Sequence, residues 1–99
     1  MEQATIWLYT LSTCSTCRRV ERLLQRAGRS YEVVAVDRLD EDQKTAIVDM
    51  LRQLDPRLTF PTLVAGETVI AGYREAEILE ALGTPRRSLQ QRFFKWFGK

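Results

Sequence analysis

The chain has 99 residues, of which 44% are hydrophobic, and this predicts a single domain with a small core. No apolar run is long enough to span a bilayer, and the first residues, Met1-Glu2-Gln3, lack the pattern of a signal peptide. The net charge of +2 is uneven, because residues 1–83 carry ten basic and thirteen acidic side chains (net −3) and residues 84–99 carry five basic and no acidic ones (net +5). The overall charge therefore indicates little about partners, and we expect no nucleic-acid partner.

Cys14-Ser15-Thr16-Cys17 is the most informative segment of the chain. It directly follows an apolar, β-branched run, Thr5–Thr10, that predicts a first strand, and it opens a segment with helical periodicity. Two cysteines three residues apart lie on one helix face, and unpaired N–H groups at a helix start favour the thiolate of the first. The arrangement predicts a reversible dithiol–disulfide pair. Without an export signal, we expect a cytoplasmic protein in which such a disulfide is transient and catalytic.

The two cysteines have three other interpretations. A zinc half-site cannot be completed within one copy, because the chain has no further cysteine and no histidine. A structural disulfide across so short a loop would restrain the unfolded chain little. Two ordinary reduced core cysteines are the third alternative. A strand followed by Cys-x-x-Cys at a helix start is the context of a redox motif, and we therefore favour the redox pair.

The first helix is expected from about Ser15 to Ala27, followed by a second strand. Its apolar face comprises Cys17, Val20, Leu23, Leu24 and Ala27, and Arg18, Arg19, Arg22 and Arg26 lie largely elsewhere. Gly28 is a good terminator for this helix. Tyr31–Val36 is almost continuously apolar, which predicts a strand covered on both faces. A strand–helix–strand unit of this length indicates parallel pairing of the two strands.

The second half of the body predicts a helix, a hairpin and a last helix. Asp37–Asp42 is an acidic helix start, the apolar stripe of the helix comprises Ala46, Ile47, Met50, Leu51 and Leu54, and Asp55-Pro56 ends it. Pro61 precedes a third strand, Thr62–Ala65, and Gly66-Glu67 is a plausible turn into an antiparallel fourth strand, Thr68–Ala71. Gly72 ends that strand. A last helix should follow and end at Gly83, with these residues facing the core: Ala76, Ile78, Leu79 and Leu82.

Residues 84–99 form a separate basic, aromatic tail after a domain of residues 1–83. Leu89, Phe93, Trp96 and Phe97 make a helical stripe, beside Arg92, Lys95 and Lys99. We expect this segment to pack as a further helix on the domain. Binding to an acidic membrane surface or to a partner groove, and disorder, are the alternatives.

The order of these elements and motifs resembles the glutaredoxin family of the thioredoxin superfamily. The resemblance covers about residues 5–83 and rests on three parts: the run from Tyr9-Thr10 to Cys14-x-x-Cys17, the segment Thr59-Phe60-Pro61-Thr62, and Gly66 followed by Gly72. It implies an α/β, thioredoxin-like fold with a four-stranded mixed sheet flanked by helices. The C-terminal amphipathic helix would be an addition to that fold.

The resemblance also implies a small thiol–disulfide oxidoreductase. Cys14 would attack a protein or glutathione mixed disulfide, and Cys17 would then attack Cys14 and release the product. In thioredoxin-like folds the proline matching Pro61 is cis and faces the dithiol, and the residue before it offers backbone groups to a bound peptide or glutathione. The resemblance gives that role to Phe60, with Thr59 beside it in the substrate-binding segment. Arg18 and Arg19 either add a cationic field or form a solvated helix surface.

Two departures from the glutaredoxin pattern concern glutathione. Glutaredoxins that bind it well usually carry a lysine three residues before the first cysteine, where this chain has Leu11. They also usually have a small residue after the late glycine, whereas here Gly72 is followed by Tyr73 and Arg74. This is more similar to glutaredoxin-like redoxins that serve ribonucleotide reductase and are recharged by thioredoxin reductase. Arg74 either pairs with an acidic group on a partner or is solvated in the first turn of the last helix.

We therefore expect protein disulfide substrates, with glutathione or a thioredoxin-reductase-type flavoenzyme as the electron source. We expect a monomer with no metal and no tightly bound cofactor. A second resemblance, of Cys-Ser-Thr-Cys-Arg and its amphipathic helix, is to the arsenate-reductase-like family, but those proteins usually insert extra helices before the proline strand. A redox-sensing adaptor that acts through a partner, and an iron–sulfur carrier that uses Cys14 of two copies with glutathione, are the remaining alternatives.

Overall fold

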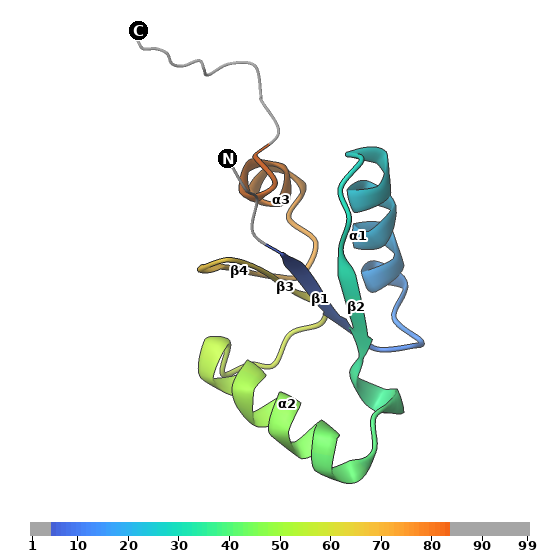
Figure 1. Cartoon of the computed structure of the whole chain (residues 1–99), viewed down its shortest axis with the longest axis vertical. Helices are drawn as coiled ribbons and strands as arrows, with labels where there is room; N and C mark the ends of the chain where they lie inside the picture. The colour runs from blue at the N-terminus through green and yellow to red at the C-terminus, as the bar shows by residue number, and fades with distance from the viewer. Residues whose placement is uncertain (1–4, 84–99) are drawn as a thin grey trace, which may run out of the picture.

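The predicted strands and helices occur in the predicted order, and one further element, a short 3-10 helix at Val36–Arg38, lies between the second strand and the second helix. The computed structural model describes residues 5–83, so the predicted helix in the tail, and the tail as a unit, lie outside the described residues. The elements are β1 (Ile6–Thr10), α1 (Ser15–Arg26), β2 (Glu32–Ala35), a short 3-10 helix η1 (Val36–Arg38), α2 (Glu41–Leu54), β3 (Thr62–Ala65), β4 (Thr68–Ala71) and α3 (Glu75–Ala81) (Figure 1).

The four strands form one mixed sheet in the order β2-β1-β3-β4. β1 pairs parallel with β2 and antiparallel with β3, and β3 pairs antiparallel with β4 through the expected hairpin. The register sets Tyr9 opposite Thr62 and Thr62 opposite Ala71. The end of β1, the start of β3 and the end of β4 therefore lie together at one end of the sheet.

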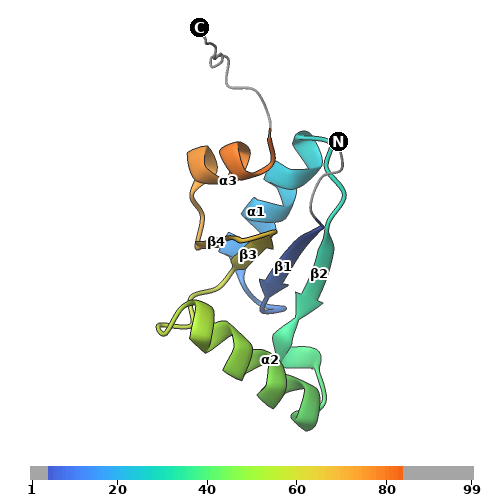
Figure 2. The ribbon, with the colours of Figure 1, turned by 60° about the vertical axis from the view of Figure 1, so that its left-hand side comes forward.

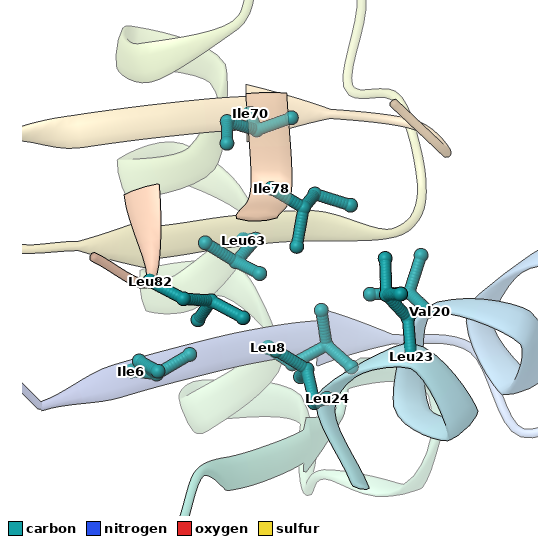
Figure 3. Packing of buried hydrophobic residues seen from close by; sticks show 9 residues of the cluster. All are labelled: Ile6, Leu8, Val20, Leu23, Leu24, Leu63, Ile70, Ile78 and Leu82. Carbon is teal, nitrogen blue, oxygen red and sulfur yellow. The ribbon is translucent and has the colours of Figure 1, made fainter. Parts of the chain in front are cut away.

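Helices cover both faces of this sheet (Figure 2). Side chains alternate between the faces along β1, so Ile6 and Leu8 point to one side and Tyr9 to the other. On the first side α1 and α3 close a core of nine buried residues (Figure 3): Ile6, Leu8, Val20, Leu23, Leu24, Leu63, Ile70, Ile78 and Leu82. On the second side α2 packs through Leu51 against Tyr9 and Val36. The sheet and its two helical layers confirm the fold class expected from the sequence.

Helix α1 is closed at its C-terminal end by a Schellman motif. Ala27 is the C-cap, and Gly28 follows with a positive φ of 73°, which glycine adopts without steric cost. The N–H of Gly28 donates to the carbonyl of Gln25 at 3.0 Å, and that of Arg29 to the carbonyl of Leu24 at 3.2 Å. Gly28 thus ends the helix as expected. The last helical residue is Arg26, one residue before the predicted limit at Ala27.

Three expectations about burial were wrong. β2 is an edge strand of four residues, and Glu32 and Val33 are exposed, so it is not covered on both faces. In α2 the apolar stripe is rotated, because Ala46 and Leu54 are exposed and Val48 packs inward instead. In α3 the predicted inward residue Ala76 is exposed. None of these three differences concerns the loop between β1 and α1 that carries the cysteines.

Candidate active site

Cys14 forms the N-cap of α1. Its backbone is extended, with φ −92° and ψ 113°, and its Sγ accepts a hydrogen bond from the backbone N–H of Cys17 at 3.1 Å. Its own N–H donates to the carbonyl of Leu11 at 3.1 Å. The sulfur thus takes the place of the usual capping oxygen and faces the unpaired N–H groups of the first turn. A negatively charged sulfur is stabilised by such a donor and by the positive end of the helix dipole.

Cys17 is one turn inside the helix and has different surroundings. It is 1% exposed, whereas Cys14 is half-buried. Burial raises the pKa of Cys17 to about 12, and the hydrogen bond and charge of the Cys14 sulfur also raise it. At neutral pH Cys17 is therefore a protonated thiol beneath a more accessible sulfur. Both sulfurs are free, so this is the reduced state of the pair.

Two other loops lie at the same end of the sheet as the cysteines. The Phe60–Pro61 peptide bond is cis, as the resemblance implied, and it leads directly into β3. The carbonyl of Pro61 accepts a hydrogen bond from the N–H of Gly72 at 2.8 Å, which links this loop to the end of β4. Gly72 has a positive φ of 84°, a conformation that side chains with a Cβ rarely adopt. Because β1 also ends here and leads into the loop with Cys14, the cis proline loop and the loop after β4 lie at the same end of the sheet as the start of α1.

Ser12 and Asp37 fasten the loop that carries Cys14. The N–H and hydroxyl of Ser12 donate to the two carboxylate oxygens of Asp37, at 3.0 and 2.5 Å. These hydrogen bonds lower the pKa of Asp37 below its ordinary value. Since Asp37 belongs to η1, directly after β2, the pair links the loop after β1 to the loop after β2. The sequence pattern indicated Asp37 only as part of a helix start, so its pairing with Ser12 was not predicted.

A second carboxylate organises the segment before Pro61. Asp55 accepts hydrogen bonds from the N–H of Thr59 at 3.1 Å and from the N–H of Arg57 at 3.2 Å, and its pKa is lowered, chiefly by the Thr59 bond. The hydroxyl of Thr62 in turn donates to the carbonyl of Thr59 at 2.6 Å. Thr59 is therefore held from both sides. Asp55-Pro56 was expected only to end α2, so this role was also missed.

The remaining predicted site residues take different positions. The guanidinium of Arg19 lies 4.3 Å from the centre of the Tyr73 ring, a cation–π contact that joins α1 to the loop after Gly72. Arg74 is the N-cap residue of α3 and forms an ion pair with Glu77 at 3.1 Å. Phe60 packs with its side chain against the cluster under α2, as does Leu11. Position 11 thus supplies an apolar contact rather than a cation.

Two negative observations apply to residues 5–83. No cluster there has three or more histidine, cysteine or acidic side chains arranged to hold a metal ion. None of the helices in this part of the chain is long and apolar enough to cross a membrane.

Known proteins resemble the chain over most of its length. The glutaredoxin family model matches residues 6–70. The glutaredoxin-like protein NrdH of Escherichia coli K12 is 29% identical over 69 residues, which cover 70% of this chain and 78% of NrdH. Methanoredoxin of Methanosarcina acetivorans is 37% identical, with a TM-score of 0.76 over 81% of this chain and 85% of its own. The structure of E. coli NrdH-redoxin gives 26% identity and a TM-score of 0.66, over 77% and 92%.

The comparisons and the geometry agree on the same chemistry. A dithiol lies at the start of α1, one sulfur capping the helix and the other buried one turn inside it. The sheet order places the cis proline loop and the end of β4 at the same end of the sheet as this dithiol. With a family model that matches about two thirds of its residues, this chain belongs to the glutaredoxin family and is a thiol–disulfide oxidoreductase.

Proposed function

We propose that Cys14 is the nucleophile and Cys17 the resolving cysteine in the reduction of protein disulfides. The Cys14 thiolate attacks one sulfur of the substrate disulfide, and the other substrate sulfur leaves and takes up a proton. Cys17 then loses its proton and attacks Cys14 in the mixed disulfide. The second substrate sulfur leaves and takes up a proton. The substrate disulfide has then gained two electrons, one for each of its sulfurs, and both come from the Cys14–Cys17 pair, which is now a disulfide.

The pKa of Cys17 supports this order of events. Part of its rise to about 12 comes from the hydrogen bond and charge of the Cys14 sulfur. Once Cys14 is bonded to a substrate sulfur it carries no charge, so that contribution disappears and the pKa of Cys17 falls. Formation of the mixed disulfide therefore makes Cys17 easier to deprotonate at the step where its thiolate is needed, although burial, the larger cause of the raised pKa, remains.

We assign substrate binding to the two loops beside the dithiol. Thr59, Phe60 and Pro61 would present backbone groups to the chain of the substrate, since Asp55 and Thr62 fix this segment from behind. Gly72, Tyr73 and Arg74 would form the opposite border. The Arg19–Tyr73 contact supports this assignment, because it holds the Tyr73 ring beside α1. The Arg74–Glu77 ion pair is exposed, so a partner carboxylate can displace Glu77 at little cost.

We propose a thioredoxin-reductase-type flavoenzyme, rather than glutathione, as the electron source, and a cytoplasmic location. The observation that carries this proposal is Leu11, which packs under α2 at the position where glutathione-binding relatives have a lysine. The bulky Tyr73 after Gly72 points the same way. E. coli NrdH-redoxin is described as a glutaredoxin-like protein with a thioredoxin-like activity profile. No tightly bound organic cofactor is needed for this exchange.

The electron source can be tested with one substrate and two recharging systems. The chain reduces a model protein disulfide while NADPH oxidation is followed, either with thioredoxin reductase or with glutathione and glutathione reductase. We expect at least tenfold faster turnover with thioredoxin reductase, which corresponds to about 1.4 kcal/mol. Cys14→Ser should abolish both reactions and serves as the control. Faster turnover with glutathione would refute the proposed electron source while leaving the roles of the two cysteines intact.

A further inference from the structure

The outward face of α1 carries a row of arginines that starts beside the dithiol. Arg18, Arg22 and Arg26 are four residues apart, so they follow one another along the helix, and all three are exposed. Cys14 precedes Arg18 by the same interval and stands at the head of the row. The buried residues of α1 lie on its opposite face: Cys17, Val20, Leu23 and Leu24. The row therefore runs from the reactive end of the helix along its solvent side.

This row is unfavourable for the domain on its own. Like charges four residues apart destabilise a helix. Within residues 5–83 the ion pairs are Arg57–Asp55 and Arg74–Glu77, and neither involves α1. By contrast, two neighbouring arginines are engaged: Arg19 lies over the Tyr73 ring and Arg29 donates to the carbonyl of Leu82. In the described part of the chain, Arg18, Arg22 and Arg26 are thus the α1 arginines with neither an ion pair nor a cation–π contact.

We infer that this row, which we call the arginine row (Arg18, Arg22 and Arg26), binds an acidic segment of the protein whose disulfide Cys14 attacks. The inference rests on the proposed function, in which Cys14 is the nucleophile. Arginine binds carboxylates with paired N–H donors, and an adjacent row of three guanidinium groups selects substrates with carboxylates near the reacting cysteine.

The spacing of the arginine row fits an extended peptide. Four residues of helix advance by about 6 Å, and alternate side chains of an extended strand are about 6.6 Å apart. An extended segment with acidic residues at alternate positions therefore places successive carboxylates opposite successive arginines. The row is only about 12 Å long and adjoins the sulfur that must reach the substrate disulfide. This position favours a segment of the disulfide substrate over a membrane or nucleic-acid surface.

The test uses two pairs of synthetic peptides, each peptide carrying one cysteine that is activated as a mixed disulfide with thionitrobenzoate. In each pair, one peptide has three aspartates at alternate positions beside the cysteine and the other has asparagines in their place. The three residues lie on the N-terminal side of the cysteine in the first pair and on its C-terminal side in the second. Attack by Cys14 forms a bond to the peptide sulfur and releases the coloured thionitrobenzoate thiolate, so stopped-flow absorbance gives the second-order rate constant without any recharging enzyme.

At about 20 mM salt we expect one aspartate version to react about tenfold faster than its asparagine counterpart, and we expect the ratio to approach one at about 500 mM salt. Arg22→Glu should abolish the preference while leaving the rate with the asparagine peptide unchanged. It also converts two repulsive i,i+4 pairs into attractive ones, so the helix should remain folded. Arg52→Glu is the matched control, because it makes the same charge change at an exposed residue of α2 and should leave the preference intact.

Three results would overturn the arginine row as a substrate site. The first is equal rates for the acidic and neutral peptides at low salt. The second is an equal loss of preference in Arg52→Glu, which would indicate a net-charge effect. The third is an Arg22-dependent retention on anionic vesicles or DNA with no peptide preference. Failure of the asparagine peptide to react at all would instead refute Cys14 as the nucleophile, so the two failures are distinguishable.

Discussion

Selective alkylation of the two cysteines is the most direct test of their assigned roles. With a pKa of about 12, Cys17 is ionised to about one part in 10⁵ at pH 7, whereas an ordinary thiol with a pKa near 8.5 is ionised to about 3%. The thiolate of Cys17 is thus about three thousand times scarcer than that of an unperturbed cysteine. Burial to 1% exposure slows its reaction further. Limiting iodoacetamide at pH 7 should therefore modify Cys14 first, with a selectivity of at least a hundredfold.

Mass spectrometry of peptides from a time course measures this selectivity. Cys17→Ser, in which Cys14 is alone, should be labelled at nearly the wild-type rate. Cys14→Ser removes the sulfur that raises the Cys17 pKa, but burial remains the larger cause, so labelling of Cys17 should stay slow. Comparable labelling of both cysteines in the wild-type chain would refute the reasoning, because it would require a Cys17 thiol that is neither buried nor protonated.

Three further predictions concern the site and the tail. Leu11→Lys should increase the rate with a glutathionylated peptide about fivefold, since a charge-assisted hydrogen bond contributes roughly 1 kcal/mol, and an unchanged rate would show that position 11 is not a determinant. Asp37→Ala should lower the melting temperature at pH 7 and slow Cys14 alkylation, because it releases Ser12; thermal unfolding and the alkylation assay measure both, and Asp42→Ala is the control. Truncation after Gly83 should lower the melting temperature by several degrees if the tail packs on the domain, since about 1 kcal/mol shifts it by roughly 4–8 °C. An unchanged melting temperature would favour the membrane or partner alternative.

The four strands and three α-helices could be predicted from the sequence because each has a local signal, whereas the residues of η1 were expected to belong to the second strand and to the start of α2. The Schellman glycine Gly28, the N-cap of α2 at Asp40, which accepts from the N–H of Gln43 at 2.8 Å, and the Gly66 hairpin all depend on residues close in the chain. Burial was predicted less well, because it depends on neighbours that the local pattern does not specify. β2 has the composition of a covered strand, yet it lies at the edge of the sheet, and an edge strand can leave Val33 exposed.

The candidate site divides along the same line. Cys14, Cys17 and the cis Pro61 could be predicted from a motif and a resemblance, because their spacing in the chain is characteristic. The hydrogen bonds of Asp37 with Ser12 cross 25 residues of sequence, and the Arg19–Tyr73 contact joins two separate elements. Aspartates beside a helix start or a proline have common local roles, so nothing in the one-dimensional pattern indicated these partners. These contacts follow only from the sheet order, which brings three loops to one end of the sheet.

The two loop carboxylates have a consequence for how activity should depend on pH. Hydrogen bonding lowers the pKa of both Asp37 and Asp55, so their contribution to stability is present above the unfolded value of about 3.9 and is lost only as pH falls through the lower folded-state values. The loops around the dithiol should therefore keep their hydrogen bonds throughout pH 5–9. The pH profile of Cys14 alkylation should then show no step between pH 5 and 6 that Asp37→Ala removes. Such a step would refute the reasoning, because it would show that the Asp37 carboxylate titrates in the working range.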